Sequence, residues 1–183
     1  MLKFLKHIGQ LLLSPGNGWE DISYVGVDPK ILASVGLYPL IGLASVSTFL
    51  KLIFDSSAEV ATLLQMAIIV FVQFFSTYFI ASAIFGVLLS KWVEGEPNEK
   101  KYTTVITYSL AIMSLIKVLE NCIPFELPLL YFLYIYVALI IWKSVRYLAV
   151  KEKSVGYFML MAICVVILVP FLLNWALTSI IVK

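Results

Sequence analysis

Residues 60–90, VATLLQMAIIVFVQFFSTYFIASAIFGVLLS, decide the fold, because this stretch between Glu59 and Lys91 contains no charged side chain. An α-helix of roughly 20 mostly apolar residues crosses the hydrocarbon core of a bilayer, which is about 30 Å thick. The stretch is long enough to do so without help from its flanks. It therefore predicts a membrane-spanning helix over residues 62–90.

Four further stretches without charged side chains predict four additional spans. The third and fourth in chain order are short, and a shallow re-entrant hairpin over 102–142 is the alternative to two spans. Two spans are favoured because lipid does not tolerate exposed turns at depth. The sequence thus predicts an all-α integral membrane bundle of five transmembrane helices, which forms a domain over residues 28–183 after a cytoplasmic amphipathic segment over 1–27. The four additional spans cover about 31–50, 102–120, 127–143 and 155–180.

Composition supports a lipid-solvated protein and excludes several classes of partner. Of 183 residues, 62% are hydrophobic and 13% are charged, whereas soluble domains are nearer half apolar and a quarter charged. The net charge is only +2 and there is no dense basic block, so nucleic acid is not an expected partner. Cys122 and Cys164 show no CxxC spacing, so we expect no metal site and no cofactor.

The N-terminal segment is predicted to be a short interfacial helix and not a signal peptide, because its apolar run is too short for a signal peptide. Over residues 1–13, four apolar side chains recur at helical spacing with basic and polar residues between them. His7 is the only histidine and is predicted to be solvated on this helix. The apolar set is Leu2, Leu5, Ile8 and Leu12, and the residues between include Lys3, Lys6 and Gln10.

Lys and Arg alternate between successive connections, and this alternation predicts the orientation. Ten of the 13 basic residues fall in the N-terminal segment and in the connections after the second and fourth spans. Basic connections tend to stay cytoplasmic. We therefore expect a multi-pass cell-membrane protein, in the inner membrane if its source is a bacterium, with a cytoplasmic N-terminus and an outer C-terminus.

Local signals predict where helices begin and bend. Asp28 followed by Pro29 is typical of the start of the first span, and Ser56 to Glu59 resembles a capping box before the second. Ser154 is placed to cap the fifth span. Pro170 lies inside that span and should kink or unwind it.

Small residues at every fourth position predict two helix-packing faces, which lie on the second and third spans. Packing within the bundle is the favoured interpretation, and a homo-oligomer is the alternative. The faces consist of Ser82, Gly86 and Ser90 on the second span and of Thr103, Thr107 and Ala111 on the third.

Polar side chains inside the spans are further candidates. Gln65 and Gln73 share one helix face, and Asn174 follows Pro170, so interhelical hydrogen bonds are expected, with a substrate path as the alternative. Lys117 and Glu120 are spaced to form an ion pair on one helix. The charged connection over 91–101 is predicted to be either a solvated loop or a contact for a cytosolic partner.

Ser14, Pro15, Trp19 and Ile22 form a P-x3-W-x2-I pattern, which precedes five spans with a tyrosine-rich fourth at Tyr131, Tyr134 and Tyr136. Together with Tyr108–Ala111, this order of features resembles the Yip family of small membrane proteins, named for interaction with Ypt/Rab GTPases. The chain has neither the long N-terminal region nor the DLxGP-like motif of eukaryotic members, and is closer to the compact bacterial branch. The resemblance implies five helices and a cytosolic N-terminus.

No catalytic motif is found: the chain has no HExxH, no glycine-rich phosphate loop and no GxSxG, so no enzymatic activity is expected. The predicted function is that of a non-enzymatic membrane scaffold or adaptor, whose partners are the lipid bilayer and an unidentified membrane or cytosolic protein. The alternative is a small transporter or channel subunit that uses Gln65, Gln73, Asn174 and the Pro170 break.

Overall fold

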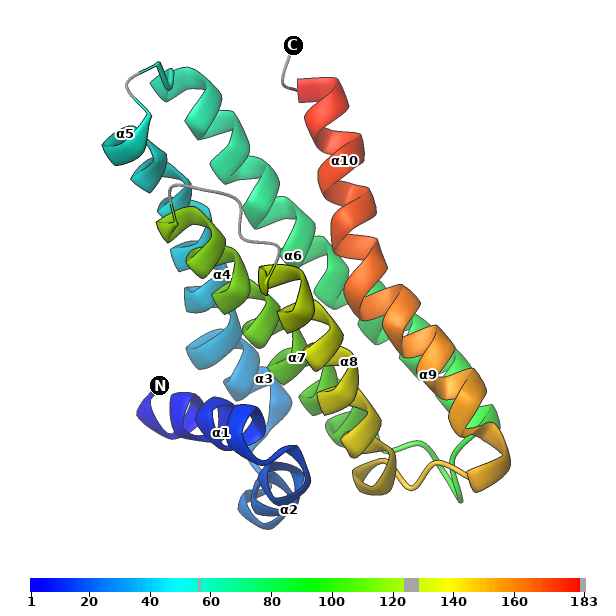
Figure 1. Cartoon of the computed structure of the whole chain (residues 1–183). Helices are drawn as coiled ribbons and strands as arrows, with labels where there is room; N and C mark the ends of the chain where they lie inside the picture. The colour runs from blue at the N-terminus through cyan, green and yellow to red at the C-terminus, as the bar shows by residue number, and fades with distance from the viewer. Residues whose placement is uncertain (56, 124–128, 182–183) are drawn as a thin grey trace.

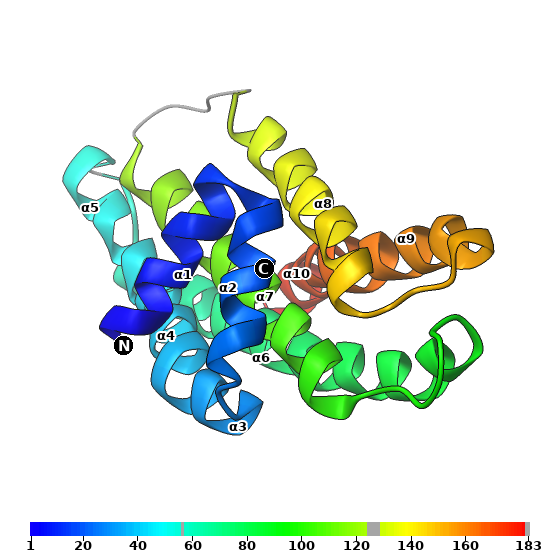
Figure 2. The ribbon, with the colours of Figure 1, turned by 90° about the horizontal axis from the view of Figure 1, so that it is seen from below.

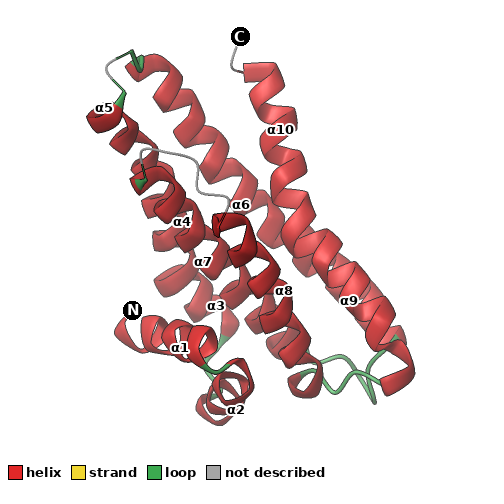
Figure 3. Ribbon diagram, viewed as in Figure 1, coloured by secondary structure: helices red, strands yellow, loops and turns green. Residues whose placement is uncertain are grey.

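The computed structural model describes residues 1–55, 57–123 and 129–181, and all regular structure in these ranges is helical apart from one isolated bridge (Figure 3). Five helical stretches are long and apolar enough to cross a membrane: Pro29–Phe54, Val60–Lys91, Glu99–Cys122, Leu130–Tyr147 and Glu152–Ile181. The all-α fold and the five helices of spanning length are confirmed, and the stretch that was the alternative re-entrant hairpin, 102–142, contains two separate helices that are each long enough to span. Of the fourth predicted span, residues 127–128 lie outside the described ranges.

The five spans contain the following elements. The first runs through α3 (Pro29–Leu32), η1 (Ala33–Leu37), α4 (Tyr38–Val46), η2 (Ser47–Leu50) and α5 (Lys51–Phe54). The second is α6 (Val60–Leu88) with η3 (Leu89–Lys91), the third is α7 (Glu99–Cys122), and the fourth is α8 (Leu129–Tyr147). The fifth joins η4 (Glu152–Ser154), α9 (Val155–Ile163), η5 (Cys164–Leu168) and α10 (Val169–Ile181).

Helix α7 is the centre of the bundle. In its most apolar stretch 72% of residues are buried, against 28% to 44% in the other four spans. It packs against α4, α6 and α8, and the long fifth span packs mainly on α6 (Figure 1). The inner position explains why α7 carries Thr104, Thr107 and Ser114, all buried, since their hydroxyl groups donate to carbonyls of the same helix instead of facing lipid.

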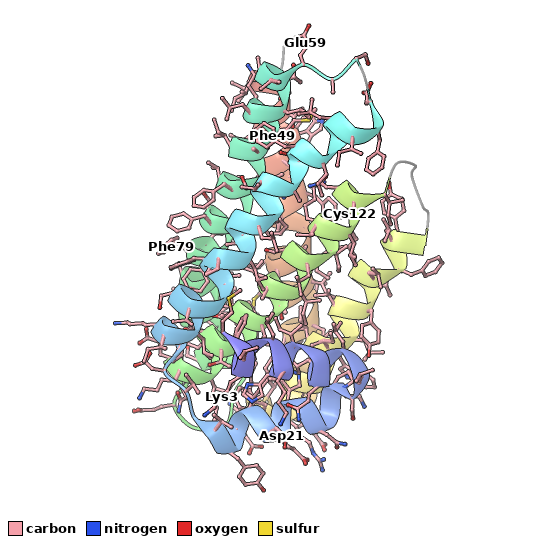
Figure 4. The ribbon with its side chains drawn as sticks, turned by 90° about the vertical axis from the view of Figure 1, so that its left-hand side faces the viewer. Lys3, Asp21, Phe49, Glu59, Phe79 and Cys122 are labelled. Atoms are coloured by element: carbon pink, nitrogen blue, oxygen red, sulfur yellow. The ribbon has the colours of Figure 1, made fainter. Side chains whose placement is uncertain are left out.

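Two helices precede the spans and lie across one end of the bundle. They are α1 (Leu2–Leu13) and α2 (Pro15–Val25), which cross the long axis of the spans (Figures 1 and 2). The connections after η3 and after α8 lie at the same end, so most of the Lys and Arg residues gather there. We call this end the basic end. In Figure 4, Lys3 and Asp21 lie at the basic end, whereas Glu59 lies at the opposite end.

Two prolines inside spans each follow a widened π-helical turn. In η1 the Tyr38 N–H donates to the Ala33 carbonyl, and Pro39 comes next; in η5 the Val169 N–H donates to the Cys164 carbonyl, and Pro170 comes next. A proline lacks the N–H and crowds the carbonyl four residues back, so an extra residue in the turn relieves both problems. The local unwinding predicted at Pro170 is confirmed, and Pro39 does the same in the first span.

The predicted helix starts have mixed outcomes. Asp28 caps α3 through its Oδ1, which accepts from Lys30 N at 2.9 Å, and Pro29 is the first helical residue, as predicted. Before α6, Glu59 itself occupies the cap position without a side-chain bond, so the predicted capping box is wrong; Ser56 lies outside the described residues. Ser154 holds the cap position of α9 but makes no side-chain cap bond.

Candidate functional site

The aromatic side chain of Tyr108, on the central helix α7, is the docking point for both N-terminal helices. Its ring stacks on Phe4 of α1 at 4.8 Å between centroids and meets the edge of Trp19 of α2 at 6.2 Å. Its hydroxyl lies 2.9 Å from His7 Nδ1, within hydrogen-bond distance. Tyr108 is fully buried, so the N-terminal helices are part of the core and not a separate appendage.

Trp19 ties α2 to α8 as well as to α7. Its indole Nε1 donates to the Ile140 carbonyl at 2.9 Å, and its ring stacks on Tyr147 at 5.5 Å between centroids. Only 2% of Trp19 is exposed. One turn before Ile140 on α8, the Tyr136 hydroxyl donates to the Leu12 carbonyl at 2.7 Å, which fixes the end of α1 on α8.

Each residue of the P-x3-W-x2-I pattern has a structural role in α2. Pro15 is the first residue of α2, where its missing N–H is not needed, and Ile22 is buried one turn after Trp19. Tyr108, the first residue of the other stretch that resembles the Yip pattern, is the residue that Trp19 meets. The structure therefore brings the two separate parts of that resemblance into contact.

The prediction of a solvated His7 is wrong. Its side chain is 8% exposed and lies between α1 and Tyr108. Burial lowers the pKa of His7 below its ordinary value, and the nearby Asp21 carboxylate only partly offsets this effect. Of the four residues that form the predicted apolar face of α1, Leu2, Leu5 and Leu12 are exposed and Ile8 is buried; a second side of the helix, which is also buried, was not predicted.

This second, buried side of α1 can be recognised only from the residues of the neighbouring helices against which it packs. Phe4 and Leu11 are buried beside glycines on two neighbouring helices. A Cβ atom at Gly36 would lie 2.6 Å from the Phe4 ring, and one at Gly18 would lie 2.9 Å from a Leu11 methyl carbon. No side chain larger than hydrogen fits at either contact.

Of the connection over 91–101, the part from Trp92 to Glu94 is held in place. Val93 pairs with Val150 in an isolated antiparallel bridge, the Glu94 N–H donates to the Ala149 carbonyl, and the Lys151 N–H donates to the Trp92 carbonyl. Val93 is 3% exposed. The prediction of a purely solvated loop is therefore wrong for this part, although Glu94, Glu96 and Lys100 are exposed.

Gln73 and Asn174 meet inside the bundle. Asn174 Nδ2 donates to Gln73 Oε1 at 2.6 Å, which bridges α6 and α10 as interhelical bonding predicts. Lys117 and Glu120 form the predicted ion pair at 2.9 Å, and Glu120 also accepts from the Tyr134 hydroxyl at 2.7 Å. These five residues line one cavity of about 60 Å³ beside Pro170, which we call the intramembrane polar cavity.

Gln65 does not join this cavity. It is half-buried eight residues before Gln73, and no hydrogen bond of its side chain is found among the described residues. The contribution of Tyr134 was missed, because its place in a tyrosine-rich span gives no sign of which tyrosine faces inward. Another missed bond joins Asn121 of α7, whose Nδ2 donates to Ser47 Oγ at 2.8 Å.

The two predicted small-residue faces differ in how closely they pack inside the bundle. Thr103, Thr107 and Ala111 are all buried on α7. Of the three small residues predicted on the second span, only Gly86 closely approaches α7, because a Cβ there would lie 3.1 Å from the Tyr102 hydroxyl oxygen. Ser82 is half-buried and bonds back to the Tyr78 carbonyl, and Ser90 is exposed.

Within the described residues there is no cluster of three potential metal-ligating side chains. Comparison with known proteins finds no matching family model, no matching curated protein and no matching solved structure. The geometry of this chain is therefore the basis on which a function can be proposed.

Proposed function

We propose that this protein is a non-enzymatic membrane scaffold or adaptor of the Yip type, with its basic end in the cytoplasm. The observation that carries the proposal is the attachment of α1 and α2 to the bundle through Trp19, His7 and Tyr108. This attachment turns the N-terminal segment into part of a fixed surface. A surface that is ordered before binding loses less conformational entropy when a partner docks.

The connections support the same surface. Two backbone hydrogen bonds between Trp92–Glu94 and Ala149–Lys151 join the connections after the second and fourth spans at the basic end. Charged side chains of both signs project from it, among them Glu20, Glu96 and Lys151, all exposed. Mixed charges on a fixed frame favour recognition of a protein partner by electrostatic complementarity.

A photo-crosslinking experiment tests the adaptor. A crosslinking amino acid is placed at Glu20 or at Glu96, with Phe79 as the control because it is 52% exposed on the flank of α6 (Figure 4). In native membranes we expect discrete protein adducts from both basic-end positions and none from Phe79. Trp19→Ala should abolish the Glu20 adduct at unchanged protein level. The absence of any protein adduct from Glu20 and Glu96 contradicts the proposal.

The intramembrane polar cavity favours a second candidate, a small transporter or channel subunit. Gln73, Asn174 and the Glu120–Tyr134 pair line it beside the π-helical turn before Pro170. Polar groups beside a break in a helix often form solute sites. Reproducible solute flux in liposomes that Gln73→Leu abolishes would establish transport, while a wild-type protein without flux favours the adaptor.

A further inference from the structure

A second cavity of about 180 Å³ opens at the basic end, where α1, α2, α7 and α8 meet. We call it the basic-end cavity. Exposed residues surround its mouth, among them Ser23, Gly26 and Asn98, and buried residues such as Tyr108 form its floor. It is separate from the intramembrane polar cavity, with which it shares no lining residue.

The ionisable groups that line the basic-end cavity are mainly basic. Its basic lining residues are His7, Lys100 and Lys101, and none of the described residues that line it is a carboxylate. The Lys101 ammonium lies 5.5 Å from the centroid of the Tyr147 ring, a cation–π arrangement that holds it at the wall. The cavity opens at the N-terminal end of α7, where the helix dipole adds positive potential.

Hydrogen-bond donors on different elements surround the space. His7 is a buried polar side chain whose Nδ1 faces the Tyr108 hydroxyl. When that hydroxyl donates to Nδ1, the neutral ring carries its proton on Nε2 and keeps one hydrogen-bond donor. The first N–H groups of α7 are partly used, because Asn98 Oδ1 accepts from Lys100 N and Lys101 N. Side chains, rather than the helix end, therefore supply the donors.

We propose that the basic-end cavity binds the phosphate group of an anionic ligand. Two lysines of α7 and a histidine of α1 suit a group with three or more acceptor oxygens better than they suit a carboxylate with two. Basic cavities between helix ends at the membrane surface are suited to phosphate headgroups. This ligand site is additional to the protein-binding surface and does not depend on it.

The phosphate can belong to a lipid headgroup or to a soluble phosphate ester. A lipid source fits the neighbouring apolar side chains of α1, since Leu2 and Leu13 are 85% and 88% exposed and can lie among acyl chains. A soluble source needs only the open mouth. The chemistry at the cavity is the same, and the experiment separates the two.

The test measures thermal unfolding of the full chain in detergent while one probe is titrated. The probes are dioctanoyl phosphatidic acid, glycerol 3-phosphate and inorganic phosphate, with dioctanoyl phosphatidylcholine as the zwitterionic control. A ligand that binds the folded state raises the midpoint in a saturable way. Stabilisation by phosphatidic acid alone identifies a lipid source, while equal stabilisation by glycerol 3-phosphate identifies a soluble one.

Two variants locate the site. Lys100→Gln with Lys101→Gln removes both ammonium groups and should weaken binding of the effective probe about thirtyfold, since each lysine near a phosphate contributes about 1 kcal/mol. The matched control, Lys151→Gln with Lys153→Gln, removes two exposed lysines from the same end and should bind as the wild type does. Ser23→Phe fills the mouth without a change of charge and should also prevent binding.

Three results overturn the proposal. One is the absence of stabilisation by any phosphate probe. Another is an equal loss of affinity in the control pair, which would show that general surface charge attracts the probe. The third is wild-type affinity in Ser23→Phe. If the double lysine variant does not fold, Lys101→Met and Ser23→Phe supply the comparison.

Discussion

Trp19 shows how one side chain joins three helices. Its ring lies on α2 between Tyr108 of α7 and Tyr147 of α8, and its indole N–H donates to the Ile140 carbonyl. Most of the contribution should come from burial of the ring, because a single neutral hydrogen bond contributes only about 1 kcal/mol net. The two parts can be separated by substitution.

We expect Trp19→Phe to weaken docking of α1 and α2 by about 1 kcal/mol, and Trp19→Ala to weaken it by about 3–5 kcal/mol. Hydrogen exchange of residues 2–25 in detergent measures the opening of this segment directly. The exchange of α6 is the internal control, since Trp19 does not contact it in the described interactions. Equal protection in Trp19→Ala and wild type would contradict the docking role.

His7 makes the stability of the N-terminal docking depend on pH. Its pKa is lowered in the folded protein, mainly by burial, so the unfolded chain binds a proton more readily. The stabilising contribution of neutral His7 is therefore complete above its ordinary pKa of 6.5 and is lost as the pH falls below that value. The charged groups around it are Asp21, Lys6 and Lys3, with Lys100 and Lys101 in the same cavity wall.

Thermal unfolding at pH 7.5 and pH 5.5 checks this dependence in the wild type and in His7→Gln. The wild type should lose more stability on acidification than the variant, because glutamine does not titrate. The difference between the two proteins removes the effect of every other titrating group. A variant that is as acid-sensitive as the wild type would show that His7 is not responsible.

At the scale of elements, the contact between α1 and the first span requires a glycine at position 36, where any side chain would meet Phe4. Gly36→Ala would place a Cβ 2.6 Å from the buried Phe4 ring, which should displace α1 at a cost of about 1–3 kcal/mol. Gly42→Ala is the matched control on the same span, since no atom lies within 4 Å of its Cβ position. Protease cleavage within residues 1–25 reports the displacement.

The control should be neutral or slightly stabilising, because alanine favours a helix more than glycine does. Adding Phe4→Leu to Gly36→Ala should recover part of the lost protection, since the smaller side chain removes the clash. If Gly36→Ala and Gly42→Ala give the same cleavage rate, α1 does not pack on the first span as described.

Positions of the spans could be predicted from the sequence, whereas the packing of the helices could not. A charge-free stretch such as 60–90 is sufficient to predict a membrane-spanning helix, because lipid accepts apolar side chains whether or not they are packed. For the same reason apolarity does not say which side is buried. Helix α1 shows this directly, with Leu2 facing outward and Leu11 fully buried.

The central place of α7 and the polar contacts were only partly predictable. Its threonines indicated a packed face, but not that the N-terminal helices cover it as well. The bond between Gln73 and Asn174 was expected as a type of interaction, while the pairing itself depends on how α6 and α10 cross. The bridge at Val93 and Val150 has no local sequence signal.

For the whole molecule, the two cysteines provide a test of orientation. Cys122 is exposed at the end of α7 away from the basic end (Figure 4), and Cys164 is exposed within the fifth span. With the basic end in the cytoplasm, a membrane-impermeant maleimide on intact cells should label Cys122 and leave Cys164 unlabelled. Cys122→Ser should lose the label. Labelling of Cys122 only from the cytoplasmic side would reverse the orientation.

The long sequence separation of the docking contacts has a consequence for biosynthesis. The partners of His7, Trp19 and Leu12 lie 101, 121 and 124 residues further along the chain. Helices α1 and α2 are synthesised before all five spans, and until the fourth span has been inserted they have only part of their binding place, which includes Gly36 of the first span and Tyr108 of the third. Complete docking of α1 and α2 is therefore a late step of assembly, and a nascent chain that stalls before Ile140 leaves these helices without their contacts to α8 and more open to chaperones and proteases.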